Sequence, residues 1–332
     1  MARRIVVVGA SAGGVEALVT LAKGLPADLQ APVAVVLHVP AGGASALPAI
    51  LARSGPLDAR HARDGEPLEP ATIYVAPPDL HLLVADRAVR LVRGPQENGH
   101  RPAIDPLFRS AAREFGAGTI AVVLTGSLDD GAAGVAVVSA RGGHVLVQDP
   151  ADAVLASMPE NAIAANNPEY VVPAAELAPI VARLAAEPAP ERTAPDKEQI
   201  EVEESHAKFD LEAIESYDLL GGPSSLSCPD CGGVLREVDD DALLRFRCRV
   251  GHAFGAQSLL DAESEAVDHA LWTALRALEE RIELSRRIAR RLRKRELDKR
   301  AERYERQAVE SQAHVKVLRE VLLGRNGDDA GE

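Results

Sequence analysis

The sequence predicts an α/β protein with a doubly wound, mostly parallel sheet of the Rossmann type, followed by a small zinc ribbon and a C-terminal helical module. Through the first half of the chain, short runs of Val, Ile and Leu alternate with helical stretches, which is the pattern of a parallel sheet covered on both faces. Three cysteines and a histidine cluster between positions 228 and 252. Residues 256–323 contain neither Gly nor Pro and are rich in Glu, Arg, Leu and Ala, as long helices are.

The first 186 residues contain the elements of the predicted sheet. β-Branched and aliphatic runs predict strands at Ile5–Val8, Pro32–His38, Ile73–Ala76, Leu80–Val84, Val89–Val92, Thr119–Thr125, Val145–Gln148 and Tyr170–Val172. Helical spacing of apolar residues predicts helices at Val15–Leu25, Ala46–Arg53, Asp105–Phe115, Gly131–Ala140 and Ala174–Leu184. The strands at 80–84 and 89–92 are close enough in the chain to form a hairpin.

The composition changes near Ala186. Residues 187–223 combine prolines with a run of acids, which predicts an acidic, mostly flexible linker with a short amphipathic helix around Leu211–Leu219. We expect a zinc-ribbon-like module at 224–255, a helical hairpin or coiled coil at 256–323 with a break near Arg295–Lys299, and a disordered tail at 324–332.

Composition also excludes several classes of protein. With 46% apolar residues the chain is not wholly disordered, and no apolar run reaches the roughly 18 residues of a membrane span. A net charge of −13 disfavours nucleic acid as a partner. The N-terminal apolar run is broken by glycines, so we interpret it as a strand and not as a signal peptide, and we expect a cytoplasmic protein.

Three polar side chains are predicted to meet at one edge of the sheet. Ser11 lies in the turn Gly9-Ala10-Ser11-Ala12-Gly13, which fits a G-x-S-x-G nucleophile elbow and equally a phosphate-binding turn. His38 ends the second strand, and both Asp129 and Asp130 follow the strand at 119–125, so either could supply the acid. Because the carboxyl ends of parallel strands share one edge, the three residues could form a Ser–His–Asp relay. Alternatively, the histidine and the aspartate could each cap a helix.

Several ordered blocks within residues 4–184 resemble the catalytic domain of the CheB-type chemotaxis protein-glutamate methylesterases. The blocks are Ile5–Gly14, Leu37–Pro40, Tyr74–His81, Arg101–Ser110, Leu124–Gly126, Asp130–Gly134, Gln148-Asp149 and Ser157–Ile163. The resemblance implies a serine hydrolase that removes methyl esters from glutamyl side chains of chemoreceptors and can deamidate glutamines. By position, Ser11 would be the nucleophile, His38 the base and Asp130 the orienting acid, with Asp129 only a neighbour.

The resemblance also implies an oxyanion hole and a substrate cleft. Backbone amides of Ala12 and Ser127 would bind the oxyanion, and Arg101 would line the cleft. The family loop usually reads Thr-Gly-Met-Gly-x-Asp-Gly, whereas here Ser127 and Leu128 replace the Met and the second Gly. A misplaced oxyanion donor costs about 10²–10³ in rate, so the substitutions bear directly on activity. Family members carry a receiver domain ahead of the esterase; this sequence starts at the esterase strand, so we expect none, and no phosphorylation control of that form.

The cysteines follow the pattern C-x₂-C-x₁₆-C-x₃-H, formed by Cys228, Cys231, Cys248 and His252. Two close pairs of soft ligands separated by a hairpin-length stretch suit tetrahedral Zn²⁺. A closed set of four protein ligands predicts a structural zinc and no cofactor for catalysis.

In the helical module, apolar residues recur at helical spacing, so two antiparallel helices or a dimeric coiled coil would bury them. The basic stretch from Arg286 to Arg306 is either a solvated face or a docking surface for an unknown protein partner. The main hypothesis is therefore a methylesterase acting in signal transduction on a methylated chemoreceptor-like protein. The alternatives are a weak or inactive signalling adaptor that binds partners through its ribbon and helices, and an anion- or nucleotide-binding domain.

Overall fold

A computed structural model describes residues 4–40, 42–43, 45–188, 217–238 and 243–328. Most of the predicted acidic linker, including most of its amphipathic helix, lies outside these residues. The chain divides into two compact units, Met1–Leu259 and Leu260–Glu332. None of the helices among the described residues is long and apolar enough to cross a membrane.

The first unit is built around a seven-stranded sheet in which every neighbouring pair of strands is parallel. Its order is β3-β4-β2-β1-β7-β8-β9. The strands are β1 (Ile5–Ala10), β2 (Val33–Leu37), β3 (Asp58–His61), β4 (Thr72–Val75), β7 (Thr119–Val123), β8 (His144–Gln148) and β9 (Tyr170–Val172). The predicted parallel sheet is thus confirmed, with all of its pairs parallel.

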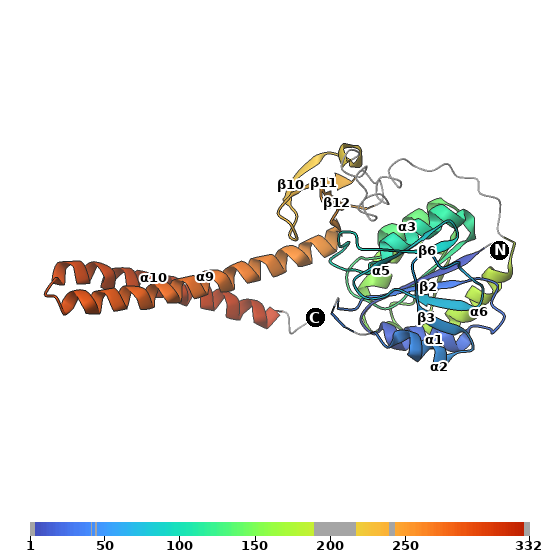
Figure 1. The fold of residues 1–332 in the computed structure, drawn as a ribbon, viewed down its shortest axis with the longest axis horizontal. Helices are drawn as coiled ribbons and strands as arrows, with labels where there is room; N and C mark the ends of the chain where they lie inside the picture. Colours follow the sequence, from blue (N-terminus) through green and yellow to red (C-terminus); the bar gives the residue numbers. More distant parts are fainter. Residues whose placement is uncertain (1–3, 41, 44, 189–216, 239–242, 329–332) are drawn as a thin grey trace. The chain divides into compact units, whose positions relative to one another are not determined.

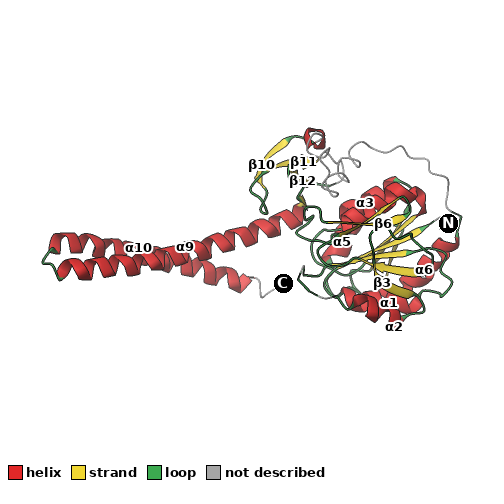
Figure 2. Cartoon of the chain, in the orientation of Figure 1, coloured by secondary structure: helices red, strands yellow, loops and turns green. Residues whose placement is uncertain are grey.

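Helices cover both faces of this sheet (Figures 1 and 2). One face is covered by α1 (Gly14–Gly24), α2 (Leu47–Ser54) and α6 (Ala174–Ala186), and the other by α3 (Ile104–Phe115), α4 (Ala132–Ala140) and α5 (Ser157–Asn166). Residues of β1 alternate between the two layers, since Val6 and Val8 join the first hydrophobic core and Ile5 and Val7 the second. Burial on both faces explains why the strands are continuous apolar runs and do not alternate with polar residues.

The structure differs from the prediction in a few elements. β3 was not predicted, because its sequence Asp58-Ala59-Arg60-His61 is polar and lies at the edge of the sheet. α5 was not predicted either, since its few buried residues, Met158, Pro159 and Ala162, make no long apolar stripe. The predicted strands at 80–84 and 89–92 form the hairpin β5 (His81–Ala85) and β6 (Ala88–Val92), which is separate from the main sheet.

The strand order reverses at β1, in the centre of the sheet. β1 pairs with β2 on one side and with β7 on the other, so the chain leaves β1 in one direction and later returns to its opposite side. Such a reversal of strand order separates the connecting loops and is where open α/β sheets bind ligands.

The first unit also contains a second, smaller sheet, which we call the ribbon (residues 217–238 and 243–255). A short 3₁₀ helix (Tyr217–Leu220) precedes an antiparallel sheet of order β10-β11-β12-β13. Its strands are β10 (Pro223–Ser227), β11 (Val234–Val238), β12 (Arg245–Cys248) and β13 (Ala253–Gly255).

The second unit is a pair of antiparallel helices, formed by α9 (Ala256–Arg293) from residue 260 onward and by α10 (Asp298–Asp328). The ion pairs Glu279–Arg319 and Arg293–Glu305 join the two helices. Buried apolar residues recur every seven positions, as in coiled coils: Leu275, Ile282 and Ala289 in α9, and Ala301, Ala308, Val315 and Leu322 in α10. α10 continues beyond residue 324, where the sequence predicts a disordered tail, and residues 329–332 are outside the described part.

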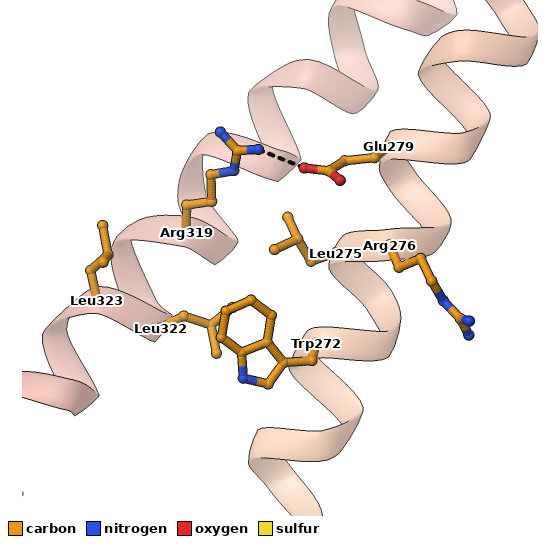
Figure 3. Close-up of a pocket in the computed structure, with 7 residues that line it drawn as sticks. All are labelled: Trp272, Leu275, Arg276, Glu279, Arg319, Leu322 and Leu323. Atoms are coloured by element: carbon orange, nitrogen blue, oxygen red, sulfur yellow. Dashed lines mark hydrogen bonds and ion pairs between the residues drawn. The ribbon is translucent and has the colours of Figure 1, made fainter.

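A groove of about 360 Å³ opens along the seam between these helices (Figure 3). Leu275 and Leu322 lie between the two helices, and Trp272 flanks them with 55% of its surface exposed. The Glu279–Arg319 ion pair crosses the seam above them, with a distance of 2.6 Å between Oε1 and Nη2. The groove therefore lies over the Leu275 and Leu322 layer of the heptad core.

Candidate active site

Ser11 lies in the sharp turn between β1 and α1. The turn depends on Gly13, whose φ of 73° is left-handed and whose added Cβ would lie 2.6 Å from Cβ of Val154. Gly126 is equally constrained, because a Cβ there would lie 2.8 Å from Cβ of Ser11. The loop after β7 therefore runs directly beside the serine, and glycine is needed for that approach.

The structure brings Ser11, His38 and Asp130 into one hydrogen-bonded relay. Oγ of Ser11 lies 3.1 Å from Nδ1 of His38, and Nε2 of His38 lies 2.7 Å from Oδ2 of Asp130. When the His38 ring is neutral and the carboxylate accepts the Nε2 proton, Nδ1 is free to accept a hydrogen bond from the serine hydroxyl. The side chains of His38 and Asp130 are only 5% and 2% exposed, so water competes little with either bond.

Three further donors hold the Asp130 carboxylate. The backbone N–H of Ile104 donates to Oδ2 at 2.7 Å, and the backbone N–H of Asp105 and Nδ2 of Asn98 donate to Oδ1 at 3.1 and 3.0 Å. Burial alone would raise the pKa of Asp130. The bond to His38, the positive charge that His38 can carry and the N–H groups at the start of α3 outweigh burial and hold this pKa well below its ordinary value. Asp130 is therefore ionised at neutral pH and can stabilise an imidazolium.

Asp105 contacts the same network, but its carboxyl group is neutral whereas that of Asp130 is negatively charged. Burial and the charge of Asp130 raise the pKa of Asp105 to about 8. Its Oδ1 accepts the backbone N–H groups of Gly131 and Gly134 at 3.1 and 2.6 Å, and its Oδ2 accepts Nδ2 of Asn98 at 3.1 Å. At pH 7 the pair therefore holds one proton on Asp105 and one negative charge on Asp130, which is the member that faces the histidine.

A tight turn, Glu97–His100, touches the relay from two sides, and we call it the NG turn. The backbones of Glu97 and His100 exchange two hydrogen bonds of 3.2 and 2.9 Å, and Asn98 and Gly99 have left-handed φ values of 52° and 74°. Both features are those of a type I′ turn, for which Asn-Gly is the preferred sequence. Asn98 and the turn were not predicted as parts of the site, although the Asn98-Gly99 dipeptide was a readable signal.

His100 is a second missed residue. Its ring stacks on that of His38, with 3.6 Å between centroids and an interplanar angle of 19°. Burial, together with the neighbouring His38, lowers the pKa of His100 to about 4, so the ring is neutral at pH 7. A neutral aromatic face packed on His38 restricts rotation of the His38 ring.

The expected oxyanion donors lie in the loops on either side of Ser11. In the described part of the chain, the backbone N–H groups of Ala12 and Ser127 donate to no protein acceptor. Those of Gly126 and Leu128 are occupied by the carbonyl of Leu155 at 3.1 Å and by Oγ of Ser157 at 2.9 Å. Leu128, where the resemblance leads us to expect a glycine, has a left-handed φ of 63°. The substituted loop thus adopts the turn that a glycine would favour.

Two predicted neighbours of the site have other contacts. The Arg101 guanidinium donates to Oδ1 of Asp79 from Nε at 2.9 Å and from Nη2 at 2.6 Å, and to the carbonyl of Gly94 from Nη1 at 2.6 Å. It therefore ties two loops together, and its role in substrate binding stays a prediction. Asp129 accepts the backbone N–H groups of Gln257 and Ser258 and the hydroxyl of Ser258, so it caps the start of α9.

The ribbon gathers the four predicted metal ligands. The thiol sulfurs of Cys228, Cys231 and Cys248 and a ring nitrogen of His252 all lie within 4.8 Å of one another. Sγ of Cys231 lies 3.7 Å from Sγ of Cys248, and Nδ1 of His252 lies 3.5 Å from that same sulfur. Zinc–sulfur bonds of about 2.3 Å give a tetrahedral edge of about 3.8 Å, so this donor set fits a zinc ion.

Comparisons with known proteins agree with this architecture. A family model described as CheB methylesterase matches residues 6–181. A protein-glutamate methylesterase/protein-glutamine glutaminase from Anaeromyxobacter dehalogenans is 43% identical over 147 residues, covering 44% of this chain and 43% of its own. One from Nocardioides is 42% identical over 191 residues, covering 56% and 52%. The crystal structure of the Thermotoga maritima CheB methylesterase catalytic domain aligns with a TM-score of 0.53 and 34% identity, covering 55% of this chain and 98% of that one.

The family model matches the sheet domain. The chain spans about half the length of the curated relatives it matches. The ribbon and the helices α9 and α10 lie outside the residues that the family model matches. The family model nevertheless covers more than half of the sequence, and its limits enclose Ser11, His38 and Asp130. This chain therefore belongs to the CheB methylesterase family.

Proposed function

We propose that the chain is a serine hydrolase that removes methyl esters from glutamyl side chains of chemoreceptor-like proteins and deamidates glutamines. The observation that carries the proposal is the Ser11–His38–Asp130 relay, with distances of 3.1 and 2.7 Å. The names of the relatives, protein-glutamate methylesterase/protein-glutamine glutaminase, support the choice of substrate.

The reaction uses these groups in two similar halves. Oγ of Ser11 attacks the glutamyl carbonyl carbon while Nδ1 of His38 takes the hydroxyl proton, and Asp130 stabilises the imidazolium. The backbone N–H groups of Ala12 and Ser127 donate to the oxyanion. His38 then protonates the leaving group, which departs as methanol from an ester or as ammonia from a glutamine. Water attacks the acyl-enzyme with His38 as base, which releases the carboxylate and regenerates Ser11.

We also propose that the ribbon binds one structural zinc ion through Cys228, Cys231, Cys248 and His252. Four protein ligands leave no open position, so the ion takes no part in the ester chemistry. The ribbon is too small to bury a core of its own, and the metal would supply much of its folding free energy. Metal analysis of the purified chain should find about one zinc per chain, and its loss in Cys231→Ser would support these ligands.

Labelling with a fluorophosphonate probe tests the hydrolase proposal. We expect covalent labelling of the wild-type chain and none of Ser11→Ala, with loss of methyl-ester hydrolysis in the same variant. Ser139→Ala is the matched control, because Ser139 is an exposed serine on α4. If the wild-type chain resists the probe while folded, the signalling-adaptor alternative is the better description; if Ser11→Ala is still labelled, the nucleophile is wrong.

A further inference from the structure

We propose that the ribbon positions the catalytic triad. Its β12–β13 hairpin holds the NG turn, Asn98 of that turn is a positioning residue for Asp130, and metal binding in the ribbon is therefore needed for full reactivity of Ser11. The inference deepens the proposed function and rests on it for the identity of the reaction.

The side chain of Asn98 bonds to the triad and to the ribbon at once. Its Nδ2 donates to Oδ1 of Asp130 at 3.0 Å and to Oδ2 of Asp105 at 3.1 Å. Its Oδ1 accepts the backbone N–H of Gly255, in β13, at 2.7 Å. Asn98 as a whole is only 6% exposed, so these hydrogen bonds are shielded from water. Because the ribbon orients one end of the amide, it also fixes where the other end meets the carboxylates.

Backbone bonds reinforce this contact. The N–H of Asn98 donates to the carbonyl of Ala253 at 2.7 Å, and the N–H of Ala253 donates to the carbonyl of Gln96 at 3.3 Å. Strand β13 therefore bonds to the backbone of the NG turn in the way that neighbouring strands bond in a sheet. The turn also carries His100, whose ring stacks on His38, so a shift of the turn would disturb both the acid and the base of the relay.

A buried cluster of ion pairs also stabilises the NG turn. Glu97 receives Nη2 of Arg109, from α3, at 2.9 and 2.7 Å, and Nη2 of Arg247, from β12, at 3.0 Å. All three side chains are at most 2% exposed. Burial alone would raise the pKa of Glu97, but the two arginines outweigh it and lower this pKa. The cluster thus joins the ribbon to the sheet domain through buried ion pairs. Breaking one of them would leave an unpaired buried charge, which is strongly destabilising.

Two of the predicted metal ligands are next to the ribbon residues that contact the NG turn. Cys248 directly follows Arg247, and His252 directly precedes Ala253. The N–H of Cys248 donates to the carbonyl of His252 at 2.9 Å, which closes the hairpin between them. The cavity between the hairpin and the turn has a volume of only about 10 Å³, about the space that one water molecule needs. A metal that fixes the two ligands would therefore fix the strands that contact the turn.

Three variants of the full chain test the positioning role. Asn98→Gly removes the amide but keeps a residue suited to the left-handed φ, and Arg247→Met removes the charge that reaches Glu97. Arg249→Met is the matched control, because Arg249 is an exposed arginine of the same hairpin. The readouts are the rate of Ser11 labelling by a fluorophosphonate, its pH midpoint, and the melting temperature.

We expect labelling to slow about tenfold in Asn98→Gly, as loss of a hydrogen bond to a charged group would give, and to slow in Arg247→Met but not in Arg249→Met. The pH midpoint should rise in Asn98→Gly, because a carboxylate with one donor fewer favours the protonated ring of His38 more strongly. A purely structural role for Asn98 would lower the melting temperature and leave the midpoint in place. Unchanged rate and midpoint in both test variants would overturn the proposal.

Removal of the metal tests the link to the ribbon. Zinc is extracted from the wild-type chain with a chelator and then restored, while Ser11 labelling and the ring ¹⁵N shifts of His38 are followed. We expect labelling to fall with zinc content and to recover on reconstitution, and the His38 shifts to lose the Nε2-protonated signature in the zinc-free chain. Constant shifts and labelling would refute the coupling. A zinc-loaded chain that is never labelled, but whose His38 shifts respond to zinc, would refute the hydrolase proposal and keep the coupling.

Discussion

The burial of His100 against His38 predicts how the stability of the fold depends on pH. His100→Phe should keep an aromatic ring against His38 while removing a group that can bind a proton. In the folded protein, burial first and His38 second lower the pKa of His100 from its ordinary 6.5 to about 4. Between these two pH values the unfolded chain binds a proton that the folded chain does not. Stability is therefore lost as the pH falls from about 6.5 towards about 4, and it is fully present above that window.

The expected magnitude follows from the same two pKa values. Acidification from pH 7 to pH 5 should cost the wild-type chain about 2 kcal/mol through this residue, since one pKa unit corresponds to about 1.4 kcal/mol. His100→Phe should lack this contribution, so the difference in unfolding free energy between variant and wild type should change by about 2 kcal/mol over that interval. His269→Phe is the control, because His269 is exposed on α9.

Hydrogen exchange of the amides of β1 and β7 is the suitable assay. These strands lie at the centre of the first unit, whereas Trp272, the single tryptophan of the chain, lies in the second unit and cannot report on it. Exchange measured at pH 5 and pH 7 gives the opening free energy at each pH. If His100→Phe and the wild type lose the same stability on acidification, the inferred environment of His100 is wrong.

Three other perturbations test the remaining features of the site. Asp130→Asn should lower the rate of ester hydrolysis by about 10³–10⁴ while the fold persists, because the amide no longer fixes the His38 tautomer; a loss below tenfold in steady-state assays would contradict the relay. In the wild type, the raised pKa of Asp105, about 8, means that stability is lost as the pH rises from about 4 towards 8, so Asp105→Asn should flatten this dependence in urea unfolding. Leu128→Gly should leave the rate of Ser11 labelling within about threefold of wild type and should leave the melting temperature equal or higher. The reason is that glycine adopts the left-handed φ of 63° without strain. Loss of labelling would show that the leucine side chain itself shapes the site.

Much of the sheet domain was accessible from the sequence because its signals are local. Strands buried on both faces must be apolar throughout, so β1, β2 and β7 are visible as Val- and Ile-rich runs. Ser11, His38 and an aspartate after β7 could be singled out because the carboxyl ends of adjacent parallel strands share an edge, and the resemblance to the family selected Asp130 over Asp129. β3 could not, since an edge strand needs no apolar run, and its sequence Asp58–His61 is polar.

The supports of the relay depend on contacts between distant segments. Glu97 and Arg247 are 150 positions apart, and no periodicity within either segment indicates that they meet. Arg101 lies in a block shared with the family, yet its guanidinium is engaged by Asp79, a pairing that sequence position could not reveal.

From the sequence alone came the parallel sheet, the three polar residues at its edge and the four-ligand metal pattern, because strand burial, strand direction and ligand spacing are properties of neighbouring residues. Only the tertiary structure determined which groups hold those three residues in place. The amide of Asn98, the ring of His100 and the buried charge of Glu97 act through contacts between segments far apart in the chain, and such packing depends on the shape and charge of both partners together.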